Sequence, residues 1–200
     1  YPFKEICGGV VAFKLIEYLF LIKGVDKEEF YEKFLPYAAI ATVCDVMPLT
    51  NENRVIVSEG IKILRKSKDL GLNALIEAAD IKKDDIDVYH LGFILGLTIN
   101  SSGRLESAKE ALELFLEKDY SIALEKAKEL RDLNYERQKL TSDAFEVIDE
   151  KIQKEGLLDK HKVLIVYEEG LNESILGIVA GKIKEKYYRP SVVLSDSKDL

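Results

Sequence analysis

Apolar residues recur at helical spacing in two long segments of the chain. In residues 10–22 this pattern predicts a buried helix, which Gly24 then ends. Residues 119–154 contain neither Gly nor Pro, and apolar residues recur along the whole segment. It predicts a helix of roughly 50 Å, at about 1.5 Å per residue. So long a helix is typical of a connection between two bodies.

A short apolar run in residues 37–43 has a different pattern. Its residues are small and show no helical spacing of polar positions, which predicts a strand buried on both faces of a parallel sheet. Asp45 lies just beyond this strand, and a helix over about 54–66 follows. Because ligands bind outside the carboxyl ends of strands in open α/β sheets, Asp45 is a candidate functional residue.

Small and polar residues mark a second candidate region. Residues 67–90 are predicted as a surface segment with one short helix over 72–79. The stretch 98–104 is small, polar and contains Gly, and it leads into a helix over 107–116. We interpret 98–104 as a loop whose Asn, Ser and Arg side chains are donors suited to a phosphate.

After Gly156 the pattern changes to a compact β–α–β order. It predicts a strand over 163–167, a helix over 174–187 and a strand over 191–194. We expect a second domain to start near residue 160 and to be cut short. A sheet without its later strands would expose an edge and an apolar face, which predicts partial disorder or self-association at that end.

Composition narrows the class of protein. The 200 residues are 47% apolar and 32% charged, which is typical of a folded globular chain. No stretch approaches the ~18–20 consecutive apolar residues of a membrane span, so we expect no membrane anchor. The net charge of −7 argues against a polyanion binder that holds its partner by a basic surface. Any nucleic-acid substrate would have to be held at local sites.

Two features bear on the cellular setting. Cys7 and Cys44 have no metal-binding or disulfide spacing, so we expect a reducing, cytoplasmic compartment and no structural zinc. The chain starts at Tyr1 with no initiator Met and no targeting segment, and we interpret it as an excised fragment.

Each candidate residue also has an ordinary structural interpretation. One carboxylate cannot hold a divalent ion, so Asp45 is either one metal ligand among several or a residue that caps a turn. Arg104 is either an anion contact or an exposed Arg beside a helix cap. Cys44 has no base in view and is interpreted as a small buried thiol.

The remaining candidates are weaker. His90 and His161 are the only histidines, and neither is spaced near another ligand, so a metal role is not predicted for either. Residues 170–174 precede a helix and form either an N-cap, which is favoured, or a phosphate-facing helix start.

Five stretches in their order resemble the RecJ exonuclease branch of the DHH phosphoesterase superfamily. The matching stretches are CGGVVAFKL at 7–15, ATVCDVMPL at 41–49 with NENR at 51–54, INSSGRL at 99–105, LNYERQ at 133–138, and GIVAGK at 177–182 with YYRP at 187–190. The family's Asp-His-His motif would lie before Tyr1 and its Arg-containing substrate loop after Leu200.

The resemblance implies an α/β fold with three parts. Residues 1–118 would be the C-terminal part of a DHH-type parallel-sheet catalytic domain. Residues 119–156 would be the connecting helix, and residues 157–200 the truncated start of a DHH-associated α/β domain.

The resemblance also assigns roles. Asp45 would be the last of the family's metal-binding aspartates, a ligand in a two-metal Mn²⁺ or Mg²⁺ centre that hydrolyses phosphodiester bonds. Asn100, Ser102, Arg104 and Asn172 would bind the substrate phosphate. The chain departs from the family in having Asn172 in place of His and Leu97 in place of Pro.

The function implied is that of a metal-dependent exonuclease degrading single-stranded DNA from 5′ to 3′ in DNA repair and recombination, with this fragment inactive alone. Two alternatives stay open: a DHH phosphoesterase acting on short oligonucleotides or cyclic dinucleotides, and a degenerate DHH protein that binds nucleic acid without hydrolysis. The implied parent is a monomer, with a single-stranded-DNA-binding protein or a helicase as partners.

Overall fold

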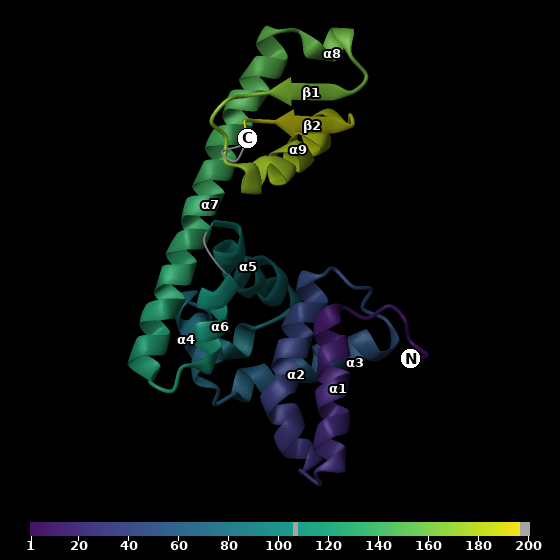
Figure 1. The fold of residues 1–200 in the computed structure, drawn as a ribbon, viewed down its shortest axis with the longest axis vertical. Helices are drawn as coiled ribbons and strands as arrows, with labels where there is room; N and C mark the ends of the chain where they lie inside the picture. The colour runs from purple at the N-terminus through teal and green to yellow at the C-terminus, as the bar shows by residue number, and fades with distance from the viewer. Residues whose placement is uncertain (106–107, 197–200) are drawn as a thin grey trace. The chain divides into compact units, whose positions relative to one another are not determined.

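The computed structural model describes residues 1–105 and 108–196, without the side chains of Arg104 and Leu105. These residues form two compact units. The first contains residues 1–103 and 108–131, and the second contains residues 104–105 and 132–196, so that one division lies inside a long helix, between Arg131 and Asp132. Figure 1 shows both units, and each is described by itself below.

The first unit consists of helices throughout its described residues. They are α1 (Gly8–Ile22), α2 (Lys27–Cys44), α3 (Asn51–Lys66), α4 (Leu70–Ala78), the 3₁₀ turn η1 (Lys83–Asp85), the π-helical turn η2 (His90–Leu95), α5 (Gly96–Leu105) as far as Gly103, α6 (Ala108–Leu116) and the first part of α7 (Tyr120–Lys154). α2 lies at their centre, packed against α1, α3 and η2. The core of this unit is therefore organised around one helix.

Several predicted helices are confirmed. α3 covers the range expected from its pattern, and α4 and α7 cover theirs except for one terminal residue each, Ala79 and Asp119. α6 covers the helix over 107–116 except Ser107, which lies outside the described residues. Gly24 follows α1 with φ +68°, a left-handed conformation that glycine adopts without steric cost. The prediction that α1 is a buried helix is only half right, because Leu15 and Ile22 on its outer face are 60% and 65% exposed.

The predicted strand over 37–43 is wrong, because these residues form the second half of α2. Buried positions here fall on several sides of the helix, so no polar face remains to reveal a helical period. Small residues allow this burial: a Cβ atom on Gly60 would lie 2.5 Å from the Cβ atom of Ala39, and one on Gly9 would lie 2.6 Å from that of Ala41. A helix buried on several sides and a buried strand look alike in a short apolar run.

The predicted loop over 98–104 is also wrong, because α5 runs through it. Ser101 and Ser102 do not break the helix, since their hydroxyls donate to carbonyl oxygens of the preceding turn, at Thr98 and Ile99. A sequence that is typical of a loop therefore continues the helix begun in η2.

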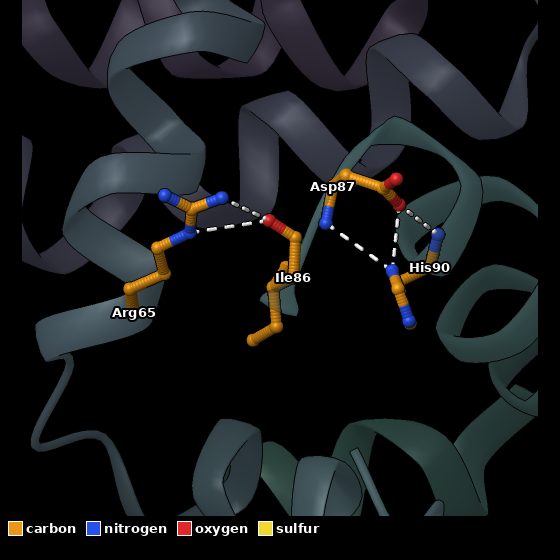
Figure 2. A network of polar contacts seen from close by, with 4 residues as sticks. All are labelled: Arg65, Ile86, Asp87 and His90. Atoms are coloured by element: carbon orange, nitrogen blue, oxygen red, sulfur yellow. Dashed lines mark hydrogen bonds and ion pairs between the residues drawn. The ribbon is translucent and has the colours of Figure 1, made fainter. Parts of the chain in front are cut away.

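Hydrogen bonds hold the turn before η2 (Figure 2). Arg65 donates from Nε and Nη2 to the carbonyl oxygen of Ile86, at 3.2 and 2.7 Å. The Asp87 carboxylate accepts from the backbone N–H of His90 at 3.1 Å, and the Asp87 N–H lies 3.3 Å from His90 Nδ1. Asp87 thus caps the start of the helix that continues into η2.

The second unit contains the predicted β–α–β order. After α7 and the short α8 (Leu157–Lys160) come β1 (Leu164–Tyr167), α9 (Glu173–Tyr187) and β2 (Ser191–Leu194). β1 and β2 pair in parallel, with Leu164 opposite Ser191. One face of this sheet packs with α7 and α9 around Ile148, Val166 and Val179.

The other face of this sheet is apolar and open. Ile165 and Tyr167 on β1, and Val192 and Leu194 on β2, are each between 44% and 62% exposed. An exposed apolar face at this end was predicted from the sequence.

The fold class is therefore more helical than predicted. In the residues that the structure describes, the two strands of the second unit are the sole sheet, and the expected parallel sheet within 1–118 is absent. No described helix is both long and apolar enough to cross a membrane.

Candidate metal and phosphate site

Asp45 is the residue at which α2 ends. Its side chain is exposed, and the chain turns back immediately after it. The N–H of Val46 donates to the carbonyl oxygen of Val43 at 3.0 Å, and that of Met47 donates to Thr42 at 3.1 Å. This hydrogen-bond pair is a Schellman motif, which satisfies the last carbonyls of the helix. Asp45 thus projects from a helix end, not from a strand.

The start of α5 lies against the end of α2. A Cβ atom on Gly96 would stand 2.1 Å from the Sγ atom of Cys44, so only glycine permits this approach. Asn100 is exposed and lies four residues beyond Gly96, on the same face of α5 and about 6 Å along its axis. The fold therefore brings Gly96, one turn before Asn100, to the end of α2 that carries Asp45.

The other predicted phosphate contacts have different placements. Ser102 is fully buried, and its hydroxyl donates to the carbonyl oxygen of Ile99 at 3.1 Å. The side chain of Arg104 lies outside the described part of the structure. Ser102 is therefore not presented at the surface beside Asn100.

Asn172 belongs to the second unit and caps α9. Its Oδ1 atom accepts from the backbone N–H of Ser174 at 3.0 Å and from the Ser174 hydroxyl at 2.7 Å. The N-cap interpretation of residues 170–174 is confirmed, and the Nδ2 group of this exposed side chain still has donor capacity.

Cys44 is not an activated nucleophile. Burial, helped by the charges of Asp45 and Cys7, raises the pKa of the Cys44 thiol to about 11, so the thiol stays protonated at neutral pH. Its Sγ atom lies 3.7 Å from the carbonyl oxygen of Leu91. Cys44 is therefore an unreactive thiol, as expected, but it is half-buried and not fully buried.

Among the described residues, Asp45 is the one candidate metal ligand that the sequence predicts. Asp45 offers a hard carboxylate oxygen, which suits Mg²⁺ or Mn²⁺. No group of three or more His, Cys, Asp or Glu side chains in the described part of the chain could hold an ion. His90 Nδ1 lies 2.6 Å from the Asp87 carboxylate, and hydrogen bonds from the His90 N–H and ring hold the pKa of Asp87 below its usual value. This histidine serves the helix cap.

Asn53 is a feature that the sequence interpretation missed. It is fully buried at the start of α3, and its Nδ2 group donates to the carbonyl oxygens of Glu5 at 2.6 Å and Pro48 at 3.0 Å. It lies inside the NENR stretch, which carried part of the resemblance but was given no role. A polar residue in the first turn of a helix offers no sign of burial, so only the fold shows this contact.

Known proteins similar to the chain are RecJ exonucleases, although no protein-family model matches it. The chain is 37% identical to the RecJ single-stranded-DNA-specific exonuclease of Bacillus subtilis over 194 residues, which are 97% of this chain and 24% of that protein. It is 31% identical to the RecJ of Thermus thermophilus over 191 residues, which are 96% of this chain and 27% of that protein. The chain thus spans about a quarter of these two relatives.

Solved structures agree with the sequences. The crystal structure of Thermus thermophilus RecJ in complex with Mg²⁺ matches with a TM-score of 0.78 and 28% identity, over 92% of this chain and 28% of that one. A crystal structure of exonuclease RecJ bound to manganese matches with a TM-score of 0.80 and 29% identity, over 97% of this chain and 48% of that one. The chain is therefore homologous to RecJ single-stranded-DNA-specific exonucleases over almost its whole length.

Proposed function

We propose that this chain is one segment of a RecJ-like exonuclease, which hydrolyses phosphodiester bonds of single-stranded DNA from the 5′ end with Mn²⁺ or Mg²⁺. The observation that carries the proposal is the 37% identity to the Bacillus subtilis exonuclease over 97% of the chain. Crystal structures of relatives that hold Mg²⁺ or manganese support the choice of metal. The other parts of the enzyme correspond to the larger share of the relatives' length that this chain does not span.

In this proposal Asp45 contributes one carboxylate ligand to a two-metal centre. When bound, the ions supply an activated water and stabilise the attacking and leaving oxygens. The part of Asp45 is to present a hard oxygen at the exposed end of α2. Asn100, which is exposed on α5, donates its amide N–H to the substrate phosphate, and Arg104 neutralises that phosphate through its planar fork.

Asn172 is also assigned a part in phosphate binding in this proposal. Because Asn cannot exchange a proton at neutral pH, its proposed part is limited to a hydrogen bond from Nδ2 to phosphate. Ser102 would have to give up its bond to Ile99 to reach a phosphate, so its proposed contribution is to pack α5 rather than to touch substrate.

The test of Asp45 is Asp45→Ala in the complete exonuclease. Nucleotide release from single-stranded DNA with Mn²⁺ should fall by about three orders of magnitude or more, because the metal centre loses a ligand. Asp26→Ala is the matched control: Asp26 is an exposed Asp at the other end of α2 with no side-chain cap bond. The 200-residue chain alone should show no hydrolysis. Unchanged release in Asp45→Ala would remove Asp45 from the metal site.

The substrate class has its own test. A long 5′-labelled single strand and a dinucleotide are compared as substrates of the complete exonuclease. Preference for the long strand supports the RecJ-like activity, and preference for the dinucleotide supports a phosphoesterase of short substrates. Binding without metal-dependent cleavage would indicate a degenerate binding protein, as the departures at Asn172 and Leu97 suggest. A monomeric cytoplasmic enzyme, working with a single-stranded-DNA-binding protein or a helicase, completes the proposal.

A further inference from the structure

The loop between α2 and α3 carries Asp45 and contains strained backbone. Val46, directly after Asp45, has φ +53°, and Asn51, at the start of α3, has φ +45°. A β-branched residue in this left-handed region costs about 1–2 kcal/mol, because its Cβ crowds the backbone. Val46 is 87% exposed, so its own side-chain contacts do little to offset that cost. The conformation must be held by the surrounding structure.

The same turn elsewhere in the chain uses less strained residues. α1 ends with an equivalent pair of hydrogen bonds, from Gly24 to Leu21 and from Val25 to Phe20, and its left-handed residue is glycine. After α4 the left-handed residue is Asp80, whose short polar side chain tolerates that region. Val46 is the β-branched exception among the described helix ends that carry this turn.

Asn53, in the first turn of α3, holds the loop by a hydrogen bond. Its Nδ2 group holds the carbonyl oxygen of Pro48, three residues after Asp45, and also that of Glu5, just before α1. One buried amide thus joins the Asp45 loop to the segment that leads into α1. The hydrogen bond from Met47 to Thr42 holds the other end of the loop on α2.

Burial of the Asn53 side chain carries a cost in free energy. Its Oδ1 atom is buried and has no hydrogen-bond partner in the described structure. An unsatisfied buried acceptor costs about 1–3 kcal/mol, which offsets much of what the two Nδ2 bonds contribute. We therefore expect Asn53 to contribute little to the free energy of unfolding, and we ascribe its effect mainly to the conformation of the loop.

We propose that Asn53 is a positioning residue for Asp45. It keeps loop 45–50 in the strained conformation that presents the Asp45 carboxylate at the end of α2. It also fixes the position of this loop relative to the segment before α1. This inference rests on the proposed role of Asp45 as a metal ligand. Partners that orient a metal ligand typically change metal affinity by about ten- to a hundredfold when they are removed.

The test compares Asn53→Ala with wild type in the complete exonuclease. The dissociation constant for Mn²⁺, measured by calorimetry well below the unfolding temperature, should rise by about tenfold or more. In the metal-free protein, amide hydrogen exchange should quicken at residues 46–50 and just before α1, because the loop is released. Asn53→Ser keeps one donor and provides the same measurements if Asn53→Ala does not fold.

Asn73→Ala is the matched control. Asn73, in α4, is the other asparagine whose Oδ1 atom is buried without a partner, and it has no contact with the Asp45 loop among the hydrogen bonds described. Its removal should leave the Mn²⁺ dissociation constant within about twofold of wild type. A change as large as that of Asn53→Ala would assign both effects to general loosening and overturn the inference.

The outcomes separate this inference from the proposed function. If Asp45→Ala loses Mn²⁺ and Asn53→Ala binds it as wild type does while melting earlier, Asn53 is only structural and the inference fails alone. If Asp45→Ala itself binds Mn²⁺ as wild type does, the proposed metal role of Asp45 fails first.

Discussion

The position of Asp45 depends on the residue that follows it. Because Val46 takes the left-handed conformation, the chain reverses at the end of α2 and leaves the Asp45 side chain exposed. The steric cost at Val46 is local, so it can be measured separately from any function. Glycine at the same position would keep the turn without crowding its Cβ.

Val46→Gly should raise the free energy of unfolding by about 0.5–1 kcal/mol. Relief of the left-handed strain exceeds the extra entropy of glycine in the unfolded chain, and the exposed valine side chain loses little packing. Urea unfolding of the two proteins measures the difference. Val55→Gly is the control: Val55 is 61% exposed inside α3, where glycine should destabilise. A loss of stability in Val46→Gly would mean that the turn holds no strain.

The type of a polar residue does not by itself predict whether its side chain faces solvent. Asn100 and Ser102 lie in one polar stretch and were assigned the same role, yet Asn100 is exposed and Ser102 is fully buried. A helix separates positions two apart by about 200°, so the two side chains point away from one another. The expected loop would have allowed Asn100 and Ser102 to face the same surface, whereas the observed helix does not.

At the scale of elements, glycines set how closely α2 meets its neighbours. The contact of Gly96 with Cys44 brings α5 to the end of α2 that carries Asp45. Any side chain on Gly96 would also meet the carbonyl oxygen of Leu91, at 2.8 Å, which is backbone and cannot move cheaply. The close approach of α5 to the end of α2 thus depends on the absence of a side chain at Gly96.

Gly96→Ala should lower the free energy of unfolding by about 1–3 kcal/mol, because the added methyl overpacks the contact between α2 and α5. Chemical unfolding followed by circular dichroism measures this change. Gly177→Ala is the contrast: Gly177 lies in α9 with nothing within 4 Å of the added atom, so helix propensity should stabilise it by about 0.5–1 kcal/mol. Equal effects in both variants would contradict the close contact at Gly96.

At the scale of the whole molecule, the two units divide at Arg131, inside the segment 119–156 that was predicted as the connecting helix. The second unit has a two-stranded sheet with one face packed and the other face open. A two-stranded sheet is marginally stable without packing on its faces, and an exposed apolar face favours association.

The chain should therefore self-associate as its concentration rises. Replacing Ile165 and Val192 together by Thr, which keeps strand propensity but removes apolar area, should shift the molecules toward monomer in sedimentation velocity. Tyr135→Ser is the control, because this residue is 74% exposed on α7, away from the sheet face. Association unchanged by the double substitution would show that another surface is responsible.

The long helix α7, the β–α–β order after Gly156 and the ordered motifs shared with RecJ could be predicted from the amino-acid sequence alone. These features depend on local periodicity or on the linear order of motifs, both of which can be followed along a sequence. The helical conformation of residues 37–43 becomes evident only in the folded chain, because burial on several sides removes the polar positions that reveal a period. It alone joined Asn53 to Glu5, 48 positions away, since a contact between distant residues leaves no local pattern.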